Sequence, residues 1–304
     1  MRPTPFPLFV LGLLSACVTD AGELQPAGDS PYPIIDSGQV HCYGAVLSID
    51  CGAGFDGQDG QYEGWPAGYA DNGDGTVTDV VTGLMWQQSP GAKVTADAAD
   101  ADGLVLAGHD DWRLPSVKEL YSLVRFSGTD PSSCGAAGSC DPTPFIDDSV
   151  FDFAYGDEAA GERLIDSQWA TSTRYVDSSQ EQMFGVNFAD GRIKGYPTGP
   201  MPGQEDGKLF FALHVRGNAE YGVNALADNG DGTITDEATG LTWLQQDSGH
   251  LGAGALGWEE ALRWAEDLDF AGHDDWRLPS AKELQSIVDY GRSPATDGTA
   301  AIDP

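Results

Sequence analysis

The chain contains two copies of one sequence unit, and this duplication constrains its fold more than any other feature. DNGDGTVTDVVTGLMWQQ at residues 71–88 recurs as DNGDGTITDEATGLTWLQ at residues 228–245. AGHDDWRLPSVKEL at 107–120 recurs as AGHDDWRLPSAKEL at 271–284. A unit of about 150 residues is much longer than the roughly 20–50 residues of a solenoid repeat, so the sequence predicts two related globular domains.

Length, composition and the repeat together predict how the chain is divided. We expect a signal peptide at 1–16, a linker at 17–36, a first domain with its lead-in segment at 37–218, and a second, incomplete domain at 219–304. Forty percent of the residues are hydrophobic, which is enough for a packed core. The 48 acidic residues against 15 basic ones give a net charge of −33. Such a surface repels phosphate backbones and argues against nucleic acid as a partner.

The first residues are typical of an export signal. Arg2 precedes the apolar run 6–14, which is too short to span a bilayer and suits the core of a signal peptide. The run ends in Leu14-Ser15-Ala16-Cys17, which resembles a lipobox. We therefore expect lipidation of Cys17 and a location in the cell envelope, at the outer membrane or the cell surface. Ordinary secretion after cleavage at small residues is the alternative.

Cysteine usage agrees with export. Five cysteines leave one without a partner if the others form disulfides. Lipidation of Cys17 leaves two close pairs, Cys42 with Cys51 and Cys134 with Cys140, and we expect both to be disulfides because the compartment is oxidising. Zinc is the alternative, but neither pair has C-x-x-C spacing and no histidine pair lies nearby.

The local patterns predict an α+β fold with two helices and a small antiparallel sheet in each unit. A helix is expected at 258–268, a weaker one at 95–104, and others after Ser116 and Ser280 because Ser-x-x-Glu forms a capping box. Short strands are expected at 75–79, 83–86, 168–173, 183–188, 192–196 and 209–215.

The two repeated blocks resemble the Lcl C-terminal domain family, a domain of unknown function. The resemblance covers about residues 37–304: the segment at 37–70 is similar to the lead-in of such domains, and VRGN at 215–218 is similar to their closing strand. The family is similar to C-type-lectin-like folds. The resemblance therefore implies a duplicated lectin-like α+β fold and surface or adhesive roles that include polysaccharide binding, without a defined chemistry.

The DNGDG loops are candidate calcium sites because oxygen ligands lie at short spacing. A turn that needs positive φ is the favoured interpretation, since the EF-hand pattern lacks its first acidic ligand and the glutamate at position twelve. The candidate ligands are Asp71, Asn72, Asp74 and Asp79 in the first copy, and Asp228, Asn229, Asp231 and Asp236 in the second.

A second repeated polar cluster follows the first. His109, Asp110 and Asp111 recur as His273, Asp274 and Asp275. Metal binding or general-base chemistry is one interpretation, and a structural loop is the favoured one because neighbouring side chains of an extended loop point apart. We expect Asp111 to pair with Arg113, and Asp275 with Arg277.

Aromatic residues could stack on sugar rings, although core packing explains most aromatics in strands. The candidates are Trp169, Tyr175, Phe184, Tyr196 and Tyr221, while Trp112, Leu114, Trp276 and Leu278 are expected in the core. No motif of a known enzyme class is present, which predicts a protein without catalytic activity.

Two classes of function remain. The first is a surface-anchored binding or adhesion module for carbohydrate or another cell-surface ligand, because a duplicated site raises avidity. The second is an extracytoplasmic hydrolase that uses loop carboxylates. A purely structural envelope lipoprotein is a third reading. No cofactor is expected apart from calcium, and the membrane is contacted through the lipid anchor alone.

Overall fold

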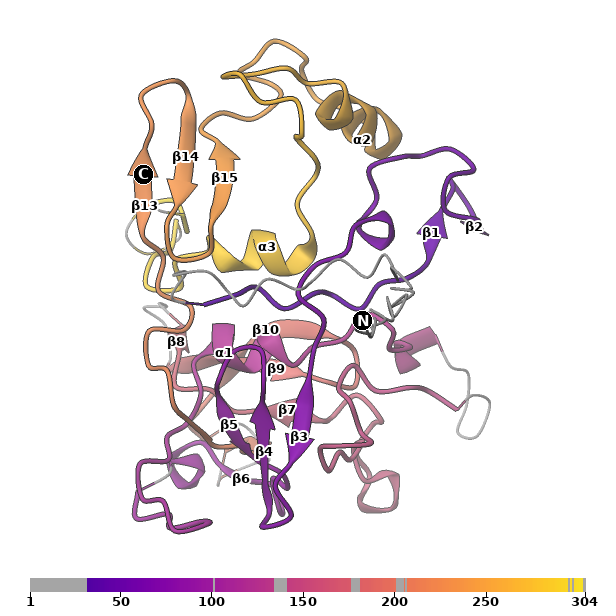
Figure 1. Cartoon of the computed structure of the whole chain (residues 1–304). Helices are drawn as coiled ribbons and strands as arrows, with labels where there is room; N and C mark the ends of the chain where they lie inside the picture. The colour runs from indigo at the N-terminus through magenta and orange to yellow at the C-terminus, as the bar shows by residue number, and fades with distance from the viewer. Residues whose placement is uncertain are drawn as a thin grey trace, which may run out of the picture.

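The computed structural model places the two copies one above the other, with helices α1 and α3 facing each other at the boundary (Figure 1). It describes residues 32–100, 102–133, 141–175, 181–200, 205, 207–294, 296 and 298–302. The predicted signal peptide, Cys17, and the Cys134–Cys140 pair lie outside these residues. The described part contains no helix with the length and apolarity needed to cross a membrane.

The elements are short, as the many glycines and turns predict. The strands are β1 (Cys42–Tyr43), β2 (Ser48–Ile49), β3 (Tyr69–Asp71), β4 (Thr76–Asp79), β5 (Met85–Gln87), β6 (Val94–Thr95), β7 (Gln168–Trp169), β8 (Arg174–Tyr175), β9 (Gln182–Asn187), β10 (Arg192–Pro197), β11 (Leu209–Phe210), β12 (Val215–Arg216), β13 (Leu226–Asp228), β14 (Thr233–Asp236) and β15 (Leu241–Leu244). The α-helices are α1 (Val117–Ser122), α2 (Trp258–Glu266) and α3 (Ala281–Ser286), and the 3-10 helices are η1 (Asp59–Gln61), η2 (Asp97–Ala99), η3 (Pro131–Ser133) and η4 (Glu158–Ala160).

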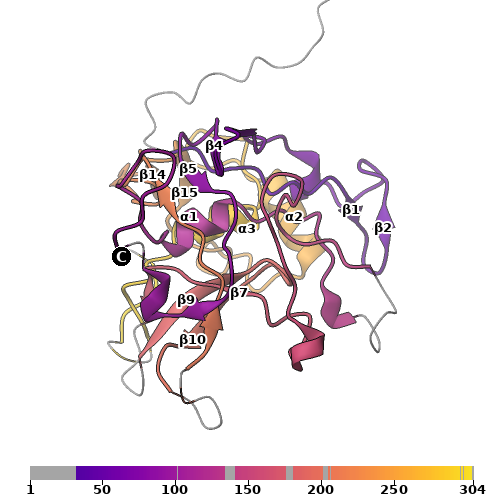
Figure 2. The same cartoon turned by 90° about the horizontal axis from the view of Figure 1, so that it is seen from below.

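The first copy contains two antiparallel sheets of four strands. One has the order β12-β5-β4-β3, so the last strand of the copy lies beside the early hairpin. The other has the order β10-β9-β7, with β8 also paired to β9. Strand β9 lies against α1, and the two elements are drawn next to each other in Figure 2. Strands from the late half of the first copy therefore complete the hydrophobic core that the early half begins.

This core is well packed. Trp86 on β5, Leu120 on α1 and Trp169 on β7 are all 0% exposed. Trp169 packs edge-on against Phe188, with 5.1 Å between the ring centroids. Burial of such large apolar side chains contributes about 1.5–3 kcal/mol each, which makes this cluster the main source of stability.

The second copy repeats the early half of the first. Strands β13, β14 and β15 form a sheet of three in which β14 pairs with both neighbours. Among the described residues, no strand follows β15 as β12 follows β5. The leucine that ends each repeated block shows the consequence, because Leu120 is 0% exposed and its counterpart Leu284 is 50% exposed.

The α+β class and most of the expected elements are confirmed, and three expectations are corrected. The stretch expected as a weak helix at 95–104 contains the short 3-10 helix η2. The strand expected at 168–173 ends at Trp169. The run at 209–215 is divided into β11, which pairs with β6, and β12, which pairs with β5, because the two ends of the run belong to different sheets.

Candidate functional site

The DWRLPS-x-KEL block builds the same helix start in both copies. In the first copy, the Ser116 hydroxyl accepts a hydrogen bond from the Glu119 amide, and the Glu119 carboxylate accepts one from the Ser116 amide. Arg113 donates two hydrogen bonds to the same carboxylate, at 2.7 and 2.5 Å. The predicted capping box is therefore confirmed, and an arginine fork holds its glutamate in place.

The second copy repeats the arrangement with Ser280, Glu283 and Arg277. The Arg277 guanidinium also lies over the ring of Tyr62, 5.2 Å from its centroid. Identical chemistry at identical spacing shows that arginine, serine and glutamate of this block serve the helix start. A backbone turn held by a bidentate ion pair gives each helix a fixed direction.

The lysine of each block crosses to the other copy. Lys118 of α1 donates to the carbonyl oxygen of Ser286 at 2.6 Å, and Lys282 of α3 donates to the carbonyl oxygen of Ser122 at 2.9 Å. Ser122 and Ser286 occupy the same position in their respective copies. The helix pair is thus joined by a reciprocal contact of the kind that a twofold axis produces.

Both lysines also contact connecting segments of the chain. Lys118 donates to the carbonyl oxygen of Gly222 and the side chain of Asn224, while Lys282 donates to the carbonyl oxygen of Asp36. Burial lowers the pKa of Lys282 to about 7 and that of Lys118 to about 8, because the charged form is desolvated. These two amines are structural donors between the copies.

A cleft of about 990 Å³ opens beside the helix pair. It has basic, acidic, hydroxyl, amide and aromatic side chains from both copies. The lining residues used below are Asp97, Ser172, Arg174, Asn224, Asp289 and Tyr290. The Arg174 side chain is 54% exposed, and its nearest acid, Glu181, is 3.6 Å away. This volume lies in the range of small-molecule sites, and the lining combines hydrogen-bond donors with acceptors.

A smaller cleft of about 310 Å³ lies on the other side of the helix pair. It is lined by Leu278 and Ser280 of the second copy, the counterparts of Leu114 and Ser116 in the larger cleft. Phe126 also lines it, at the position that Tyr290 has in the repeat. The two clefts are therefore related by the same approximate symmetry as the helices.

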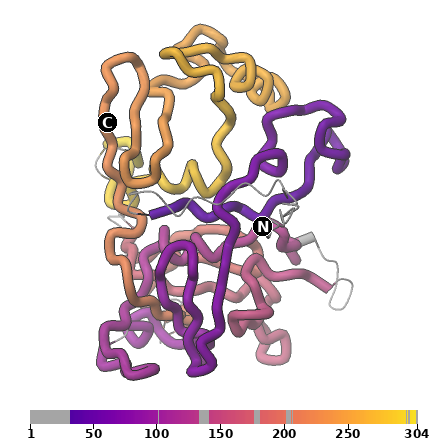
Figure 3. Tube along the Cα trace, in the orientation of Figure 1, coloured from indigo at the N-terminus to yellow at the C-terminus, as the bar shows by residue number. Residues whose placement is uncertain are grey.

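The lead-in segment of the first copy packs against the second copy. The tube in Figure 3 follows this segment from the side of α2 down into the first copy. Phe55 stacks on Trp258 of α2 with 5.6 Å between ring centroids, and the Tyr62 hydroxyl donates to Glu266. Burial and the neighbouring Glu266 raise the pKa of Tyr62 to about 12, so this hydroxyl keeps its proton at neutral pH.

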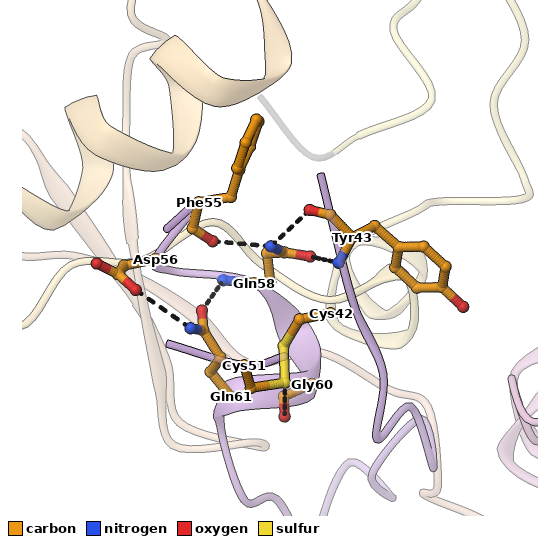
Figure 4. Close-up of a disulfide and its surroundings, with 8 residues drawn as sticks. All are labelled: Cys42, Tyr43, Cys51, Phe55, Asp56, Gln58, Gly60 and Gln61. Carbon is orange, nitrogen blue, oxygen red and sulfur yellow. Dashed lines mark hydrogen bonds between the residues drawn. A yellow bond between two sulfur atoms is a disulfide. The ribbon is translucent and has the colours of Figure 1, made fainter. Parts of the chain in front are cut away.

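A disulfide holds this lead-in segment. The bond between Cys42 and Cys51 is present as expected (Figure 4). Beside it, the Gln58 side chain accepts from the Tyr43 amide at 2.8 Å and donates to the carbonyl oxygens of Tyr43 and Phe55. Gln58 is 5% exposed, so its amide group is buried and fully engaged. The disulfide and this glutamine fix the position of the ring that stacks on α2.

The candidate calcium loops form turns in both copies. Asp71 accepts from the Gly73 amide at 2.8 Å, and Asp74 accepts from the Thr76 hydroxyl at 2.6 Å. Gly73 has a φ of 73°, as the turn interpretation requires. Asp228 and Asp231 make the equivalent bonds in the second copy, and Asn72 and Asn229 donate to threonines of the adjoining strand.

The last acid of each loop has a different environment. Asp79 and Asp236 are 0% exposed, while the acids at the loop tips are exposed. Asp79 accepts from the backbone amides of Val81 and Thr82, and burial raises its pKa. No group of three histidine, cysteine, aspartate or glutamate side chains suited to a metal ion is found in the described residues.

The comparisons with known proteins agree with the repeat. The family model of the Lcl C-terminal domain matches residues 75–202 and 232–303, which is more than half of the chain. The chain belongs to the Lcl C-terminal domain family. No curated protein and no solved structure shows significant similarity to it.

The HDD cluster of each Lcl C-terminal unit follows a tight turn. Ala107 and Ala271 have φ values of 53° and 54°, and the residues on either side form two-residue hairpins that end at His109 and His273. The expected pairing of Asp111 with Arg113 is wrong. Asp111 instead forms a two-point contact with Arg216, at 2.7 and 3.1 Å, because β12 lies beside this segment.

The same correction applies to the second Lcl C-terminal unit. Arg277 pairs with Glu283, and Asp275 is exposed with no ion pair among the described residues. Asp110 and Asp274 are also exposed. The structural-loop interpretation of this cluster agrees with these positions.

Most of the candidate stacking residues belong to the core of the first Lcl C-terminal unit. Trp169, Tyr196 and Tyr221 are at most 8% exposed, and Tyr175 and Phe184 are half-buried and contact each other. Trp112 is in the core as expected, at 6% exposed, and Leu114, Trp276 and Leu278 are half-buried.

Sequence reasoning missed Tyr290, Arg174 and the two crossing lysines. The lysine had a usable signal, because it recurs at the same position of both Lcl C-terminal blocks. Arg174 and Tyr290 had none, since they come together only when the two copies pack.

Proposed function

We propose that the chain is an extracytoplasmic binding module whose ligand is a neutral carbohydrate held in the 990 Å³ cleft. The observation that carries this proposal is the mixed lining of that cleft. A sugar hydroxyl both donates and accepts, so it matches a site where Arg174 offers donors while Asp97 and Asp289 offer acceptors.

The aromatic ring and the charges that line the cleft support the same ligand class. Tyr290 offers the edge or face of a ring beside these polar groups, as sugar sites often need. An anionic polysaccharide fits less well, because the chain carries a net charge of −33 and acids line the cleft. The proposal also includes a C-type-lectin-like fold for the chain, which is what the family resemblance implies.

A glycan array followed by titration calorimetry tests the proposal. We expect saturable binding to a neutral glycan, weakened about tenfold by Arg174→Ala because a hydrogen bond to a charged group is lost. Arg163→Ala is the matched control, since Arg163 is 72% exposed and outside the cleft lining. Equal effects of the two variants, or no binding to any neutral glycan, would contradict the proposal.

The same samples separate the other classes of function. Release of new reducing ends from a bound glycan would indicate the hydrolase alternative and direct attention to the cleft carboxylates. Binding without turnover supports the module reading. A structural envelope lipoprotein would bind none of the array.

Anchoring to the cell envelope is part of this proposal and rests on Cys17. Val18 follows it, and a residue other than aspartate at this position favours delivery to the outer membrane in a cell with two membranes. Cys17→Ser is expected to move the protein from the membrane fraction to the soluble fraction. Unchanged fractionation would contradict the lipid anchor.

A further inference from the structure

The β1–β2 hairpin of the lead-in segment has an apolar turn. This turn, residues 44–47, reads Gly-Ala-Val-Leu and joins the two paired strands. Val46 is 88% exposed and Leu47 is 73% exposed, so neither side chain is part of the core. Val40, just before β1, is 70% exposed. A group of large apolar side chains therefore lies in solvent here, and we call residues 44–47 the hairpin tip.

Other hairpins of the chain have polar turns. The β3–β4 turn contains Asn72 and Asp74, the β13–β14 turn contains Asn229 and Asp231, and the β9–β10 turn contains Asp190. Aspartate, asparagine and glycine are the residues that tight turns favour. The turn itself therefore does not explain valine and leucine at the hairpin tip. A group of exposed apolar side chains marks a surface that contacts another molecule or a membrane.

The base of the hairpin tip is fixed. The disulfide between Cys42 and Cys51 ties its two strands together. The buried Gln58 side chain accepts from the Tyr43 amide and donates to the Tyr43 carbonyl oxygen, which holds β1 from below the tip. Both views of the molecule place β1 and β2 at its outer edge (Figures 1 and 2). The tip is thus held outward on a firm support.

The surroundings of the hairpin tip suit a neutral lipid surface. Residues 37–49 contain no aspartate, glutamate, lysine or arginine, although the chain has 48 acidic residues. Tyr43 is 41% exposed, and its ring points away from the disulfide (Figure 4). Tyrosine favours the headgroup level of a bilayer, whereas valine and leucine favour its hydrocarbon. An uncharged apolar tip with a tyrosine at its base matches the interface of a neutral bilayer.

We propose that the hairpin tip inserts into the bilayer that carries the lipid anchor, an inference that rests on the anchoring of Cys17 in the proposed function. Fifteen residues separate Cys17 from Tyr32, a length of chain that reaches at most about 50 Å. The anchor therefore holds the lead-in segment near one membrane. A second, linked apolar contact strengthens membrane binding, as a second anchoring signal does. The inserted tip gives the anchored chain a fixed orientation on the membrane.

Sedimentation with vesicles tests this insertion. The chain that begins at residue 17 and carries Cys17→Ser is used, so that neither the apolar run 6–14 nor a lipid contributes. It is mixed with sucrose-loaded vesicles of phosphatidylcholine and phosphatidylethanolamine at millimolar lipid. We expect a bound fraction that rises with lipid and slower amide exchange at residues 44–47. Val46→Glu is expected to lower the partition coefficient at least about tenfold, because it places a charge in the apolar layer.

Val80→Glu is the matched control. Val80 is 64% exposed in the β4–β5 turn, and Glu237 occupies the same position in the second copy, so this turn accepts glutamate. We expect this variant to partition as the parent does. Both variants are expected to keep the melting temperature of the parent, since both side chains are exposed. Vesicles of phosphatidylglycerol are expected to bind less, because the chain carries a net charge of −33.

Four results would overturn the inference. The first is no bound fraction at millimolar lipid, and the second is equal partition of the Val46→Glu and Val80→Glu chains. The third is stronger binding to phosphatidylglycerol than to neutral vesicles. The fourth is a dimer without vesicles that Val46→Glu separates, because a second copy of the chain would then cover the tip. None of these measurements needs a lipidated chain, so fractionation of Cys17→Ser tests the anchor separately.

Discussion

The early halves of the two copies share their turns, capping boxes and ion pairs, yet they differ in how deeply their apolar residues are buried. In the first copy, the late strands cover Trp86 and Leu120. In the second copy, Trp243 is half-buried and Leu284 is half-exposed. Local hydrogen bonds therefore form the same structure twice, whereas the apolar core depends on strands that come from far along the chain.

The leucine pair gives the largest expected difference between the copies. Leu120→Ala is expected to lower the free energy of unfolding by about 3 kcal/mol, because it opens a cavity in a closed core. Leu284→Ala is expected to lower it by less than about 1 kcal/mol, since half of that side chain is already in solvent. Urea denaturation measures both values. Equal losses would show that the second copy has a closed core in solution.

The disulfide gives the next largest effect. Replacing Cys42 and Cys51 together by serine is expected to cost about 2 kcal/mol, as for other bridges that close short loops. Because Phe55, whose ring stacks on Trp258, follows closely after the bridged segment, amide exchange is expected to rise more in α2 than in α1. Hydrogen exchange with mass spectrometry measures this. A greater rise of amide exchange in α1 than in α2 would show that the lead-in segment packs mainly against the first copy.

The pH dependence of stability gives a further comparison of the two copies, through the crossing lysines Lys118 and Lys282. The folded-state pKa of Lys282 is lowered to about 7 by burial, so the unfolded chain binds more protons between pH 7 and 10. Stability therefore rises with pH in this window, by at most about 1.4 kcal/mol per pH unit for one group. Lys282→Met is expected to flatten this slope.

Lys118→Met is the comparison variant. It is expected to reduce the slope above pH 8 only, because the pKa of Lys118 is lowered to about 8. Urea denaturation at pH 7, 8 and 9 measures the slopes. A parent chain that loses stability over this range would contradict this account of both lysines.

Salt and calcium give the smallest effect. Sodium chloride is expected to raise the melting temperature by a few degrees, since it screens repulsion within a chain of net charge −33. Calcium and magnesium are expected to act alike at matched ionic strength, because the acids at the loop tips accept bonds within their own turns. Thermal denaturation with each salt measures this. A rise specific to calcium would restore the metal interpretation of the DNGDG loops.

The sequence predicted the features that depend on neighbouring residues. The repeat, both capping boxes, the turn at Gly73 and the Cys42–Cys51 bridge follow from spacing alone. The pairing of Asp111 was not predictable, because Arg216 lies 105 residues away and adjacent Arg113 was the nearer choice. The larger cleft was also not predictable, since its two walls belong to different copies.

The reciprocal lysine contacts have a consequence for how the chain unfolds. If α3 leaves α1, Lys118 loses the carbonyl of Ser286 and Lys282 loses the carbonyl of Ser122 in the same event. The two contacts between the copies are therefore lost together and not one after the other. The two copies are consequently expected to unfold in one shared transition, although each repeats the same sequence unit.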